Sequence, residues 1–499
     1  MKSFHSFCYK SITILGLSLL LILAVSSIFI YGHLDSSSQE RMVFYKNGMV
    51  FFILIPVFFF ALWKFRDLLK KVTPGKLFLI CSLIYIIAGL YLTFRVPDTI
   101  RSDPYMIYKY AKKFLDADYE GLTGGYYLRF FPYQLGMVTF EMGLLSIWNS
   151  TRILFIANLI LILGINFLQW RITELLSKNK LVINYSIALS FGFVPMLFYI
   201  LFTYGTIPGH FFLCLGYYFL IKHIKNHSPL SFIFCGLSLG IAVIFKPNYL
   251  IAAVACAIII FMDLLKRFSK GKLVILVIVI VLSIAPNKAF LQMWRNISGV
   301  DFDGGAPYVL NVTMGLQPEE MGKGRLGGWY NGYNYDTFEL NNYDIEASKK
   351  VAFEDMKNLA EHWKNNSAAA RKFFIDKIHS TWNDPLFQSL WSGPLEDSDQ
   401  VVTDKLLHSL FTGGHVAMVF EKYMNLVMIS IYLLAAAWCF MNLTKKSGDD
   451  SELFYLLLFL GGFIFHLISE TKSQYVYMYA YSLIPYAAIT LCSKFGRKS

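Results

Sequence analysis

The chain is a series of long apolar runs separated by short polar turns and two longer polar segments. Most of these runs approach the ~20 residues that a helix needs to cross a bilayer. The pattern predicts an all-α polytopic membrane protein with about 12 transmembrane helices, joined by amphipathic juxtamembrane helices. The spans are expected near 11–31, 47–64, 77–94, 152–171, 181–202, 208–222, 229–245, 248–264, 272–288, 427–443, 452–469 and 475–492.

Basic residues cluster in the loops that share a side with the N-terminus. Cytoplasmic loops carry an excess of Lys and Arg, so this distribution predicts cytoplasmic termini. The residues in question are Lys64, Arg66, Lys70, Lys71, Arg171, Lys178, Lys180, Lys222, Lys225, Lys266, Arg267, Lys270, Lys272, Lys445 and Lys446. The polar segments 95–134 and 289–426 are then exterior.

Composition divides the chain into four parts. These are an N-terminal transmembrane hairpin with a basic loop (1–76), a transmembrane core containing the first exterior loop (77–288), a large exterior segment (289–426) and C-terminal transmembrane helices (427–499). The apolar run at 133–149 is short, which predicts a half-span or a steep juxtamembrane helix. The exterior segment is mixed, because a glycine-rich and aromatic-rich stretch precedes helical patterns at 345–365 and 368–381.

Overall composition narrows the class of protein. The chain is 56% hydrophobic and only 16% charged, with a mean hydropathy of +0.49. Its net charge of +12 is concentrated in short loops, so it indicates orientation in a membrane and not binding to nucleic acid. The seven cysteines form no disulfide framework, and P-loop, Rossmann, HExxH and GxSxG motifs are missing. Chemistry driven by ATP or a dinucleotide is therefore not expected.

The first exterior loop, 95–134, carries the leading candidates for catalysis, Asp98 and Asp103. From Pro104 the apolar residues recur with helical spacing, while lysines occupy the other face. This pattern predicts an amphipathic helix lying flat in the headgroup layer. Asp103 followed by Pro104 also has the form of a helix start, so a capping role is as well supported by the spacing as a chemical one.

Further polar groups fall where the exterior membrane surface should be. Lys246 lies in a turn between two apolar runs and either extends to the headgroups or binds a phosphate. Arg129 is an interfacial anchor or another phosphate ligand. Glu470 and Lys472 either pair with each other or face a cavity together with Tyr475. No cofactor is required by the sequence, although Asp98 and Asp103 could share a divalent metal ion.

These features together resemble the GT-C superfamily of integral membrane glycosyltransferases. The resemblance is greatest to the bacterial branch of protein mannosyltransferases and aminoarabinose transferases. It rests on the acidic first exterior loop, on YYLRFFPYQLGMVTFE beginning at Tyr126, on the KPN turn at Lys246, on the SETKSQY turn, and on MGLQPEE, GWYNGYN and TWNDPLFQSLW. It covers most of the chain from about residue 77, leaving 11–63 as an additional N-terminal hairpin.

The resemblance implies transfer of a sugar from a polyprenyl-phosphate donor to an extracytoplasmic acceptor in the cell envelope. The carboxylate of the family's first exterior loop corresponds to Asp103, with Asp98 as the second candidate. The family's acidic pair is adjacent or one residue apart, whereas these aspartates are five positions apart, which leaves the choice of base open. Lys246, Arg129 and Lys472 are the expected ligands of the donor phosphate, and Glu470, Tyr475 and Tyr126 the expected ligands of the substrate.

Two other classes of protein share several of these features. A flippase or transporter of lipid-linked glycans would also be polytopic, but it should carry ionisable residues midway along helices and repeat symmetry. A surface polysaccharide polymerase or ligase would use the same kind of lipid donor and transfer a whole glycan. The sequence identifies neither the sugar nor the acceptor.

Overall fold

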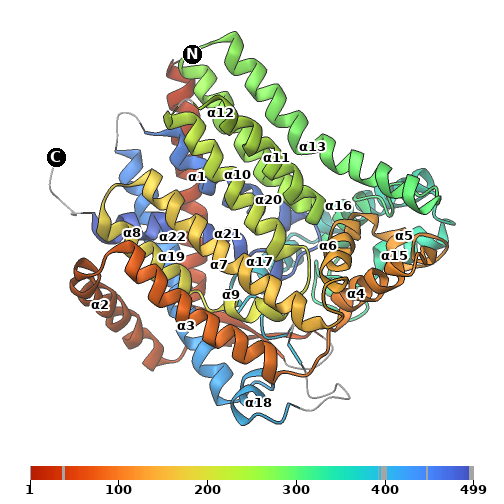
Figure 1. Ribbon diagram of the computed structural model, residues 1–499, viewed down its shortest axis with the longest axis horizontal. Helices are drawn as coiled ribbons and strands as arrows, with labels where there is room; N and C mark the ends of the chain where they lie inside the picture. The colour runs from red at the N-terminus through yellow and green to blue at the C-terminus, as the bar shows by residue number, and fades with distance from the viewer. Residues whose placement is uncertain are drawn as a thin grey trace.

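The computed structural model is a bundle of α-helices with one short β-hairpin, and it describes residues 2–35, 40–226, 228–391, 393–394, 402–444 and 448–493. Figure 1 shows long helices running side by side, with smaller helices gathered at one end of the bundle. Within the described residues, the expected all-α polytopic architecture is confirmed.

Eight helices in the described part of the chain are long and apolar enough to cross a membrane. A bent pair, α8 (Lys180–Gly192) followed by α9 (Pro195–Phe198) and a 3₁₀ turn, makes a ninth if its two halves, 49° apart, form one span. The eight are α1 (Lys2–Phe29), α2 (Met49–Lys71), α3 (Pro74–Arg95), α7 (Thr151–Leu176), α12 (Leu250–Lys266) with the 3₁₀ turn Pro247–Tyr249 that precedes it, α13 (Lys270–Ser298), α19 (His415–Leu443), and α20 (Phe454–Ile468) with the 3₁₀ turn Asp450–Leu453 that precedes it.

Three of the expected spans, at 208–222, 229–245 and 475–492, are not among these helices. α10 (Thr206–Asn226) and α11 (Pro229–Phe245) pack against each other within the bundle, and α11 has only 17 residues. The last apolar run divides into α21 (Tyr477–Ser482) and α22 (Ile484–Cys492). A span count of about 12 therefore stays a prediction. The run at 133–149 forms α6 (Leu135–Leu145), whose 11 residues rise ~16 Å, about half the hydrocarbon thickness.

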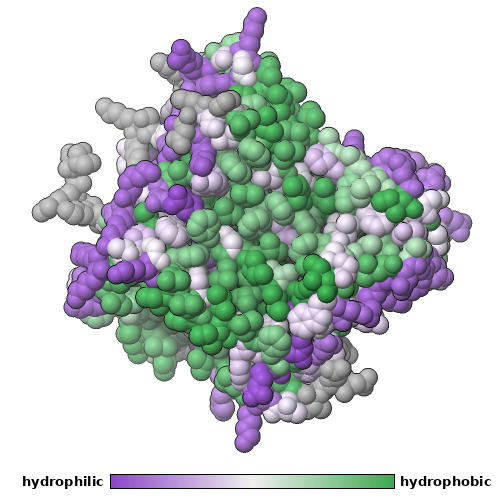
Figure 2. Space-filling model, viewed as in Figure 1, coloured by the Kyte–Doolittle hydropathy of each residue, from purple (hydrophilic) through white to green (hydrophobic). Residues whose placement is uncertain are grey.

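The outer surface of the bundle is apolar. α2 leaves Ile53, Val57 and Phe60 more than half exposed, and α13 does the same with Val274 and Val277. Figure 2 shows a hydrophobic surface over the helical bundle, with hydrophilic surface at the end that carries the small helices. An apolar surface of this extent would be unfavourable in water and matches the hydrocarbon of a bilayer.

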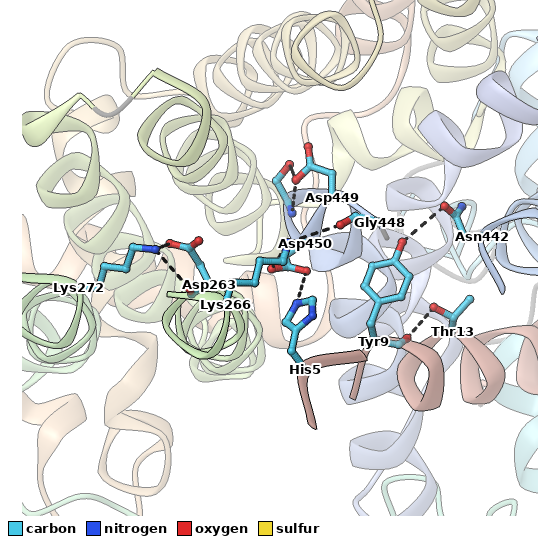
Figure 3. Close-up of polar contacts among 11 residues, drawn as sticks. His5, Tyr9, Thr13, Asp263, Lys266, Lys272, Asn442, Gly448, Asp449 and Asp450 are labelled. Carbon is cyan, nitrogen blue, oxygen red and sulfur yellow. Dashed lines mark hydrogen bonds and ion pairs between the residues drawn. The ribbon is translucent and has the colours of Figure 1, made fainter. Parts of the chain in front are cut away.

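The N-terminal end of α1 lies where several basic helix ends meet. There the buried Asp450 carboxylate accepts from His5 Nε2 at 2.9 Å, and its other oxygen forms an ion pair with Lys266 Nζ at 2.8 Å, as Figure 3 shows. Lys225, at the end of α10, lies 3.4 Å from Asp449. These contacts bring together the ends of helices that the sequence places on one side of the membrane.

Replacing Asp450 should destabilise the bundle. Asp450→Asn removes the anion from a side chain that is 4% exposed, which leaves His5 and Lys266 without a counter-charge. We expect the free energy of unfolding to fall by about 1–3 kcal/mol. The measurement is thermal unfolding of the purified protein in detergent.

The neighbouring Asp263–Lys272 pair, at 2.7 Å, is the matched control, because both of its side chains are partly exposed. Lys272→Gln should shift the stability by less than about 1 kcal/mol. Equal effects of the two substitutions would show that burial of Asp450 does not matter.

The opposite end of the bundle carries the small helices. Starting from the first polar loop, α4 (Ser102–Leu115), α5 (Tyr127–Phe130) and α6 are followed by α14 (Val309–Gly315), α15 (Tyr333–Leu340), α16 (Ile345–Asn365), α17 (Ser367–Trp382) and α18 (Lys405–Phe411). The helices expected at 345–365 and 368–381 are confirmed as α16 and α17. In Figure 1 most of this group lies well away from both chain termini.

The amphipathic helix expected after Pro104 is present as α4, but its surroundings differ from the prediction. Ile107, Tyr110, Ala111 and Phe114 are buried against protein, chiefly α6, instead of facing lipid. The expected capping role of Asp103 is wrong, because the helix begins two residues earlier than expected, at Ser102, and Arg101 is its N-cap residue. The sequence pattern identified the apolar face correctly, but it could not tell protein from lipid as the surface that covers it.

The N-terminal transmembrane hairpin expected as an addition to the fold packs as part of it, through a β-hairpin between α1 and α2. After α1 the chain forms β1 (Ile30–Leu34), which pairs antiparallel with β2 (Met42–Lys46). Gly32 N–H donates to the carbonyl of Asn383 at 2.8 Å, and Asn383 Nδ2 donates back to the carbonyl of Ile30 at 3.0 Å. This hairpin therefore fixes the segment that follows α17.

Candidate functional site

Five charged side chains meet at the end of the bundle opposite His5. Asp103 lies in the first turn of α4, Lys246 follows α11, and Glu470 and Lys472 lie in the turn after α20. Glu40 lies between β1 and β2, just before β2 begins. Lys472, Glu40 and Lys246 are all close enough to shift the pKa of Asp103. We call these five residues the acidic-basic cluster.

Asp103 is the free carboxylate of this cluster. Within the described part of the chain, its side chain has neither a hydrogen bond nor an ion pair, and solvent reaches it. The surrounding protein raises its pKa by desolvation, while Lys472 and Lys246 oppose this effect. A carboxylate with no partner and a raised pKa can accept a proton from an incoming group.

Lys472 is held by Glu40 through two contacts, at 2.8 Å and 2.7 Å. Both side chains are largely buried. Burial lowers the pKa of Lys472, but Glu40, Glu470 and Asp103 outweigh it, so the pKa rises and the ammonium stays charged. The expectation that Lys472 pairs with Glu470 is wrong, because Glu40 takes that place.

Glu470 is the second carboxylate with unused bonding capacity. Its Oε1 is buried and has no hydrogen-bond partner among the described residues. Burial raises its pKa to about 7, against the opposing effects of Lys472 and Lys246. The backbone around it is fixed, since its N–H donates to the carbonyl of Asn311 at 2.8 Å, and Lys377 Nζ donates to the carbonyl of Ser469 at 2.9 Å.

Lys246 points into the cluster instead of extending to the headgroups. Its Nζ lies 4.4 Å from the centre of the Tyr475 ring and 5.0 Å from that of Tyr204, and it donates to Thr206 Oγ1 at 3.4 Å. Burial lowers its pKa to about 7, although Glu470 and Asp103 favour the charged form. An anion that binds here would therefore interact with the Lys246 ammonium, whose charge the surrounding protein balances only in part.

Tyrosines surround the charged groups. Tyr475 lies beside Lys246, and Tyr330 lies beside Lys472, with 5.7 Å between Nζ and the ring centre. Asp103 and Glu470 are also close enough to raise the pKa of Tyr133. Such rings offer an apolar face and a hydroxyl edge, which suits a sugar with its C–H faces and hydroxyl groups.

Three residues predicted for the site lie in other contacts. Asp98 accepts a hydrogen bond from Thr151 Oγ1 at the start of α7. Both terminal guanidinium nitrogens of Arg129 donate to Asp303, at 2.5 Å and 3.3 Å, so its charge is already balanced.

Tyr126 is the third predicted site residue that lies in another contact. Its hydroxyl donates to Glu120 Oε1 at 2.5 Å on an exposed surface. The structure thus brings together Asp103, Lys246, Glu470, Lys472 and Tyr475, but it does not bring Asp98, Arg129 or Tyr126 to them through any described contact.

Sequence reasoning missed Glu40, Tyr330 and Tyr133. Glu40 lies in a short polar segment between two apolar runs, and nothing in its spacing relates it to Asp103 or Lys472. The one signal was its place, shared with Asp35, in a turn that the sequence predicts to be exterior. The described residues also contain no group of three or more His, Cys, Asp or Glu side chains placed to hold a metal ion.

The cluster combines a free base with cations at the edge of an apolar bundle. A carboxylate such as Asp103 can take a proton from a hydroxyl group, and a lysine such as Lys246 can stabilise an anion that forms nearby. No protein-family model matches the chain, and no curated protein matches it either.

Proposed function

We propose that this protein is a membrane glycosyltransferase. It transfers a sugar from a polyprenyl-phosphate donor to an acceptor in the cell envelope, on the extracytoplasmic side of the membrane. The observation that carries the proposal is the free carboxylate of Asp103, which lies near Lys246 and Lys472 at one end of an apolar helical bundle.

The charges of the cluster fit a reaction with a phosphate leaving group. Asp103 accepts the proton of the acceptor hydroxyl while that oxygen attacks the anomeric carbon of the donor. The bond between that carbon and the phosphate oxygen breaks, and the configuration inverts. The departing phosphate is stable as an anion, so no general acid is needed, unlike in a glycosidase. Lys246 balances its charge, because Lys472 is already engaged by Glu40.

The arrangement of helix ends supports an exterior site. The basic ends gather around Asp450, at the N-terminal end of α1. If that end is cytoplasmic, both termini are cytoplasmic and the acidic-basic cluster faces outward. No nucleotide sugar is expected outside the cell, so a lipid-borne donor explains a transferase without a nucleotide-binding fold.

The test compares envelope glycans from cells that have the intact chain, a deletion, and the Asp103→Asn or Asp98→Asn variant at matched expression. Mass and linkage analysis should show one sugar substituent missing in the deletion and in Asp103→Asn, but present in Asp98→Asn. If both variants match the wild type while the deletion accumulates untransported lipid-linked glycan, the protein is a flippase. Loss of whole glycan chains instead of a single sugar would identify a polymerase or ligase.

Substitution of Glu40 or Lys472 should shift the acid side of the pH profile of transfer activity. Glu40 raises the pKa of both Asp103 and Glu470, whereas Lys472 lowers both. A base must be deprotonated, so transfer activity falls as the pH drops through its pKa. Glu40→Gln should move this fall to lower pH, and Lys472→Met should move it to higher pH.

The measurement is kcat/KM across a pH series for both variants and for the wild-type protein in nanodiscs. Lys323→Met, which removes an exposed partner of Asp336, is the matched control and should leave the profile in place. Shifts of the same sign in both cluster variants would contradict the assignment.

A further inference from the structure

A pocket lies next to the acidic-basic cluster and takes no part in the proposed proton transfer. It contains about 490 Å³ of empty space, part of which is open to solvent, and is bounded by β1, by the segment after α17, by α18 and by the first turns of α19. Among its lining residues are His33, Asp384, Gln388, Trp391 and Glu421.

The cavity shares a wall with the cluster. Ser473 Oγ donates to Asp384 Oδ2 at 2.6 Å, and Ser473 directly follows Lys472 in the chain. On another side, the Arg101 guanidinium lies 3.9 Å from the centre of the Trp391 ring, two positions before Asp103. A molecule in the cavity would therefore lie near Asp103.

Two buried N–H groups in this wall lack an acceptor. Gln388 is 2% exposed and Trp391 is 8% exposed. Neither Gln388 Nε2 nor Trp391 Nε1 has a hydrogen-bond partner among the residues that the structure describes. A buried donor left without a partner costs about 1–3 kcal/mol. Two such donors in one cavity indicate a ligand with acceptor oxygens.

The backbone that carries Gln388 is strained. Phe387 and Gln388 have φ values of 49° and 56°, in the left-handed region that residues with a side chain rarely adopt. The Asp384 carboxylate holds this conformation by accepting from the N–H groups of Leu386 at 3.0 Å and Gln388 at 2.8 Å. Strain of this kind persists where the surrounding structure fixes it, and it recurs at ligand sites.

The charged groups of the cavity disfavour an anionic ligand. Asp384 and Glu421 are carboxylates, and Asp35 is a third in the lining. The imidazole of His33 is bound to Glu421 at 2.7 Å, so it offers no free cation. The lysines that suit a phosphate lie on the other side of the wall, in the acidic-basic cluster.

We infer that this cavity binds an uncharged, hydroxyl-rich saccharide unit of the acceptor through the free N–H groups of Gln388 and Trp391. Sugar hydroxyl oxygens accept from these two donors, and hydroxyl hydrogens donate to the carboxylates. The assignment of the saccharide as an acceptor rests on the proposed glycosyltransferase function, whereas binding itself does not. Donor phosphate and acceptor sugar would then occupy opposite sides of Asp103.

The test is binding of defined sugars to the purified protein in nanodiscs, measured by saturation-transfer NMR without any donor. Maltose, cellobiose and N,N′-diacetylchitobiose are the neutral probes, and glucuronate is the anionic one. We expect at least one neutral probe to bind and glucuronate not to bind. Trp391→Phe removes the indole N–H, which should weaken binding about 5- to 10-fold.

The matched control is Trp363→Phe, because Trp363 Nε1 is also buried without a partner among the described residues but belongs to α16, where its ring stacks on Phe373 of α17. Asp103→Asn should bind the neutral probe as the wild type does. Binding that is unchanged by Trp391→Phe, or the absence of binding by every neutral probe, overturns the subsite. Binding that depends on Trp391 in a protein without transfer activity would support the subsite and contradict the proposed function.

Discussion

Asp103→Asn should lower kcat for sugar transfer by about 10²- to 10⁴-fold, the range expected for loss of a general base. The amide has nearly the same shape as the carboxylate but cannot take the proton of the acceptor hydroxyl. Since the Asp103 side chain has neither a hydrogen bond nor an ion pair among the described residues, its replacement breaks no visible contact. Abundance and thermal stability should therefore stay near those of the wild type. The measurement is single-turnover release of polyprenyl phosphate from a defined lipid donor.

Two substitutions separate this role from the alternatives. Asp98→Asn keeps a hydrogen-bond acceptor for Thr151 and should leave kcat within about 3-fold of the wild type, since Asp98 lies outside the cluster. Glu470→Gln tests the other carboxylate that has an unpartnered oxygen. If Glu470→Gln causes the large loss and Asp103→Asn does not, Glu470 is the base and the present assignment is wrong.

Lys246→Met should lower kcat by about 10²- to 10³-fold, as loss of one preorganised group that stabilises a developing anion does. Methionine keeps the length and the apolar packing against Tyr475 and Tyr204 but removes the charge. Arg129→Met is the comparison, because the Arg129 charge is already balanced by Asp303. A larger loss in Arg129→Met than in Lys246→Met would move the phosphate site away from the cluster.

Lys246→Arg tests the charge without removing it. Burial lowers the pKa of Lys246 to about 7, so the free protein loses this cation as the pH rises through that value. The alkaline side of the kcat/KM profile should therefore fall near neutral pH in the wild type. Arginine stays charged up to a pH of about 12, so the variant should retain activity at higher pH. An alkaline fall at the same pH in Lys246→Arg would assign it to another group.

The sequence by itself determined the class of protein and which residues form most of the helices. Apolar runs of membrane-spanning length form α1, α2, α3 and α7. In a bilayer the backbone N–H and C=O groups must find hydrogen-bond partners within the segment, and a helix provides them. Helical periodicity likewise located α16 and α17. These are local properties, so the order of residues along the chain was enough.

Residues at helix ends were also predictable as candidates. Asp103, Lys246, Glu470 and Lys472 each follow an apolar run on the side away from the basic loops. Polar groups near hydrocarbon are costly, so their presence at one surface invites a functional interpretation. The sequence could place them at the same depth, but it could not say which of them meet.

Only the tertiary structure decided the membership of the site. Glu40 lies far from Lys472 in the chain, yet the two form the closest ion pair of the cluster because the N-terminal hairpin packs beside the turn after α20. Arg129 pairs with Asp303, and Asp98 accepts from Thr151, through contacts between distant segments.

The same limit explains why α4 was assigned to lipid. An apolar face shows that something covers it, but lipid and protein are equally apolar partners. Which surface covers a helix, and which charges share a cavity, depends on how all the helices pack. That packing is a property of the whole chain and is not encoded in any one stretch of it.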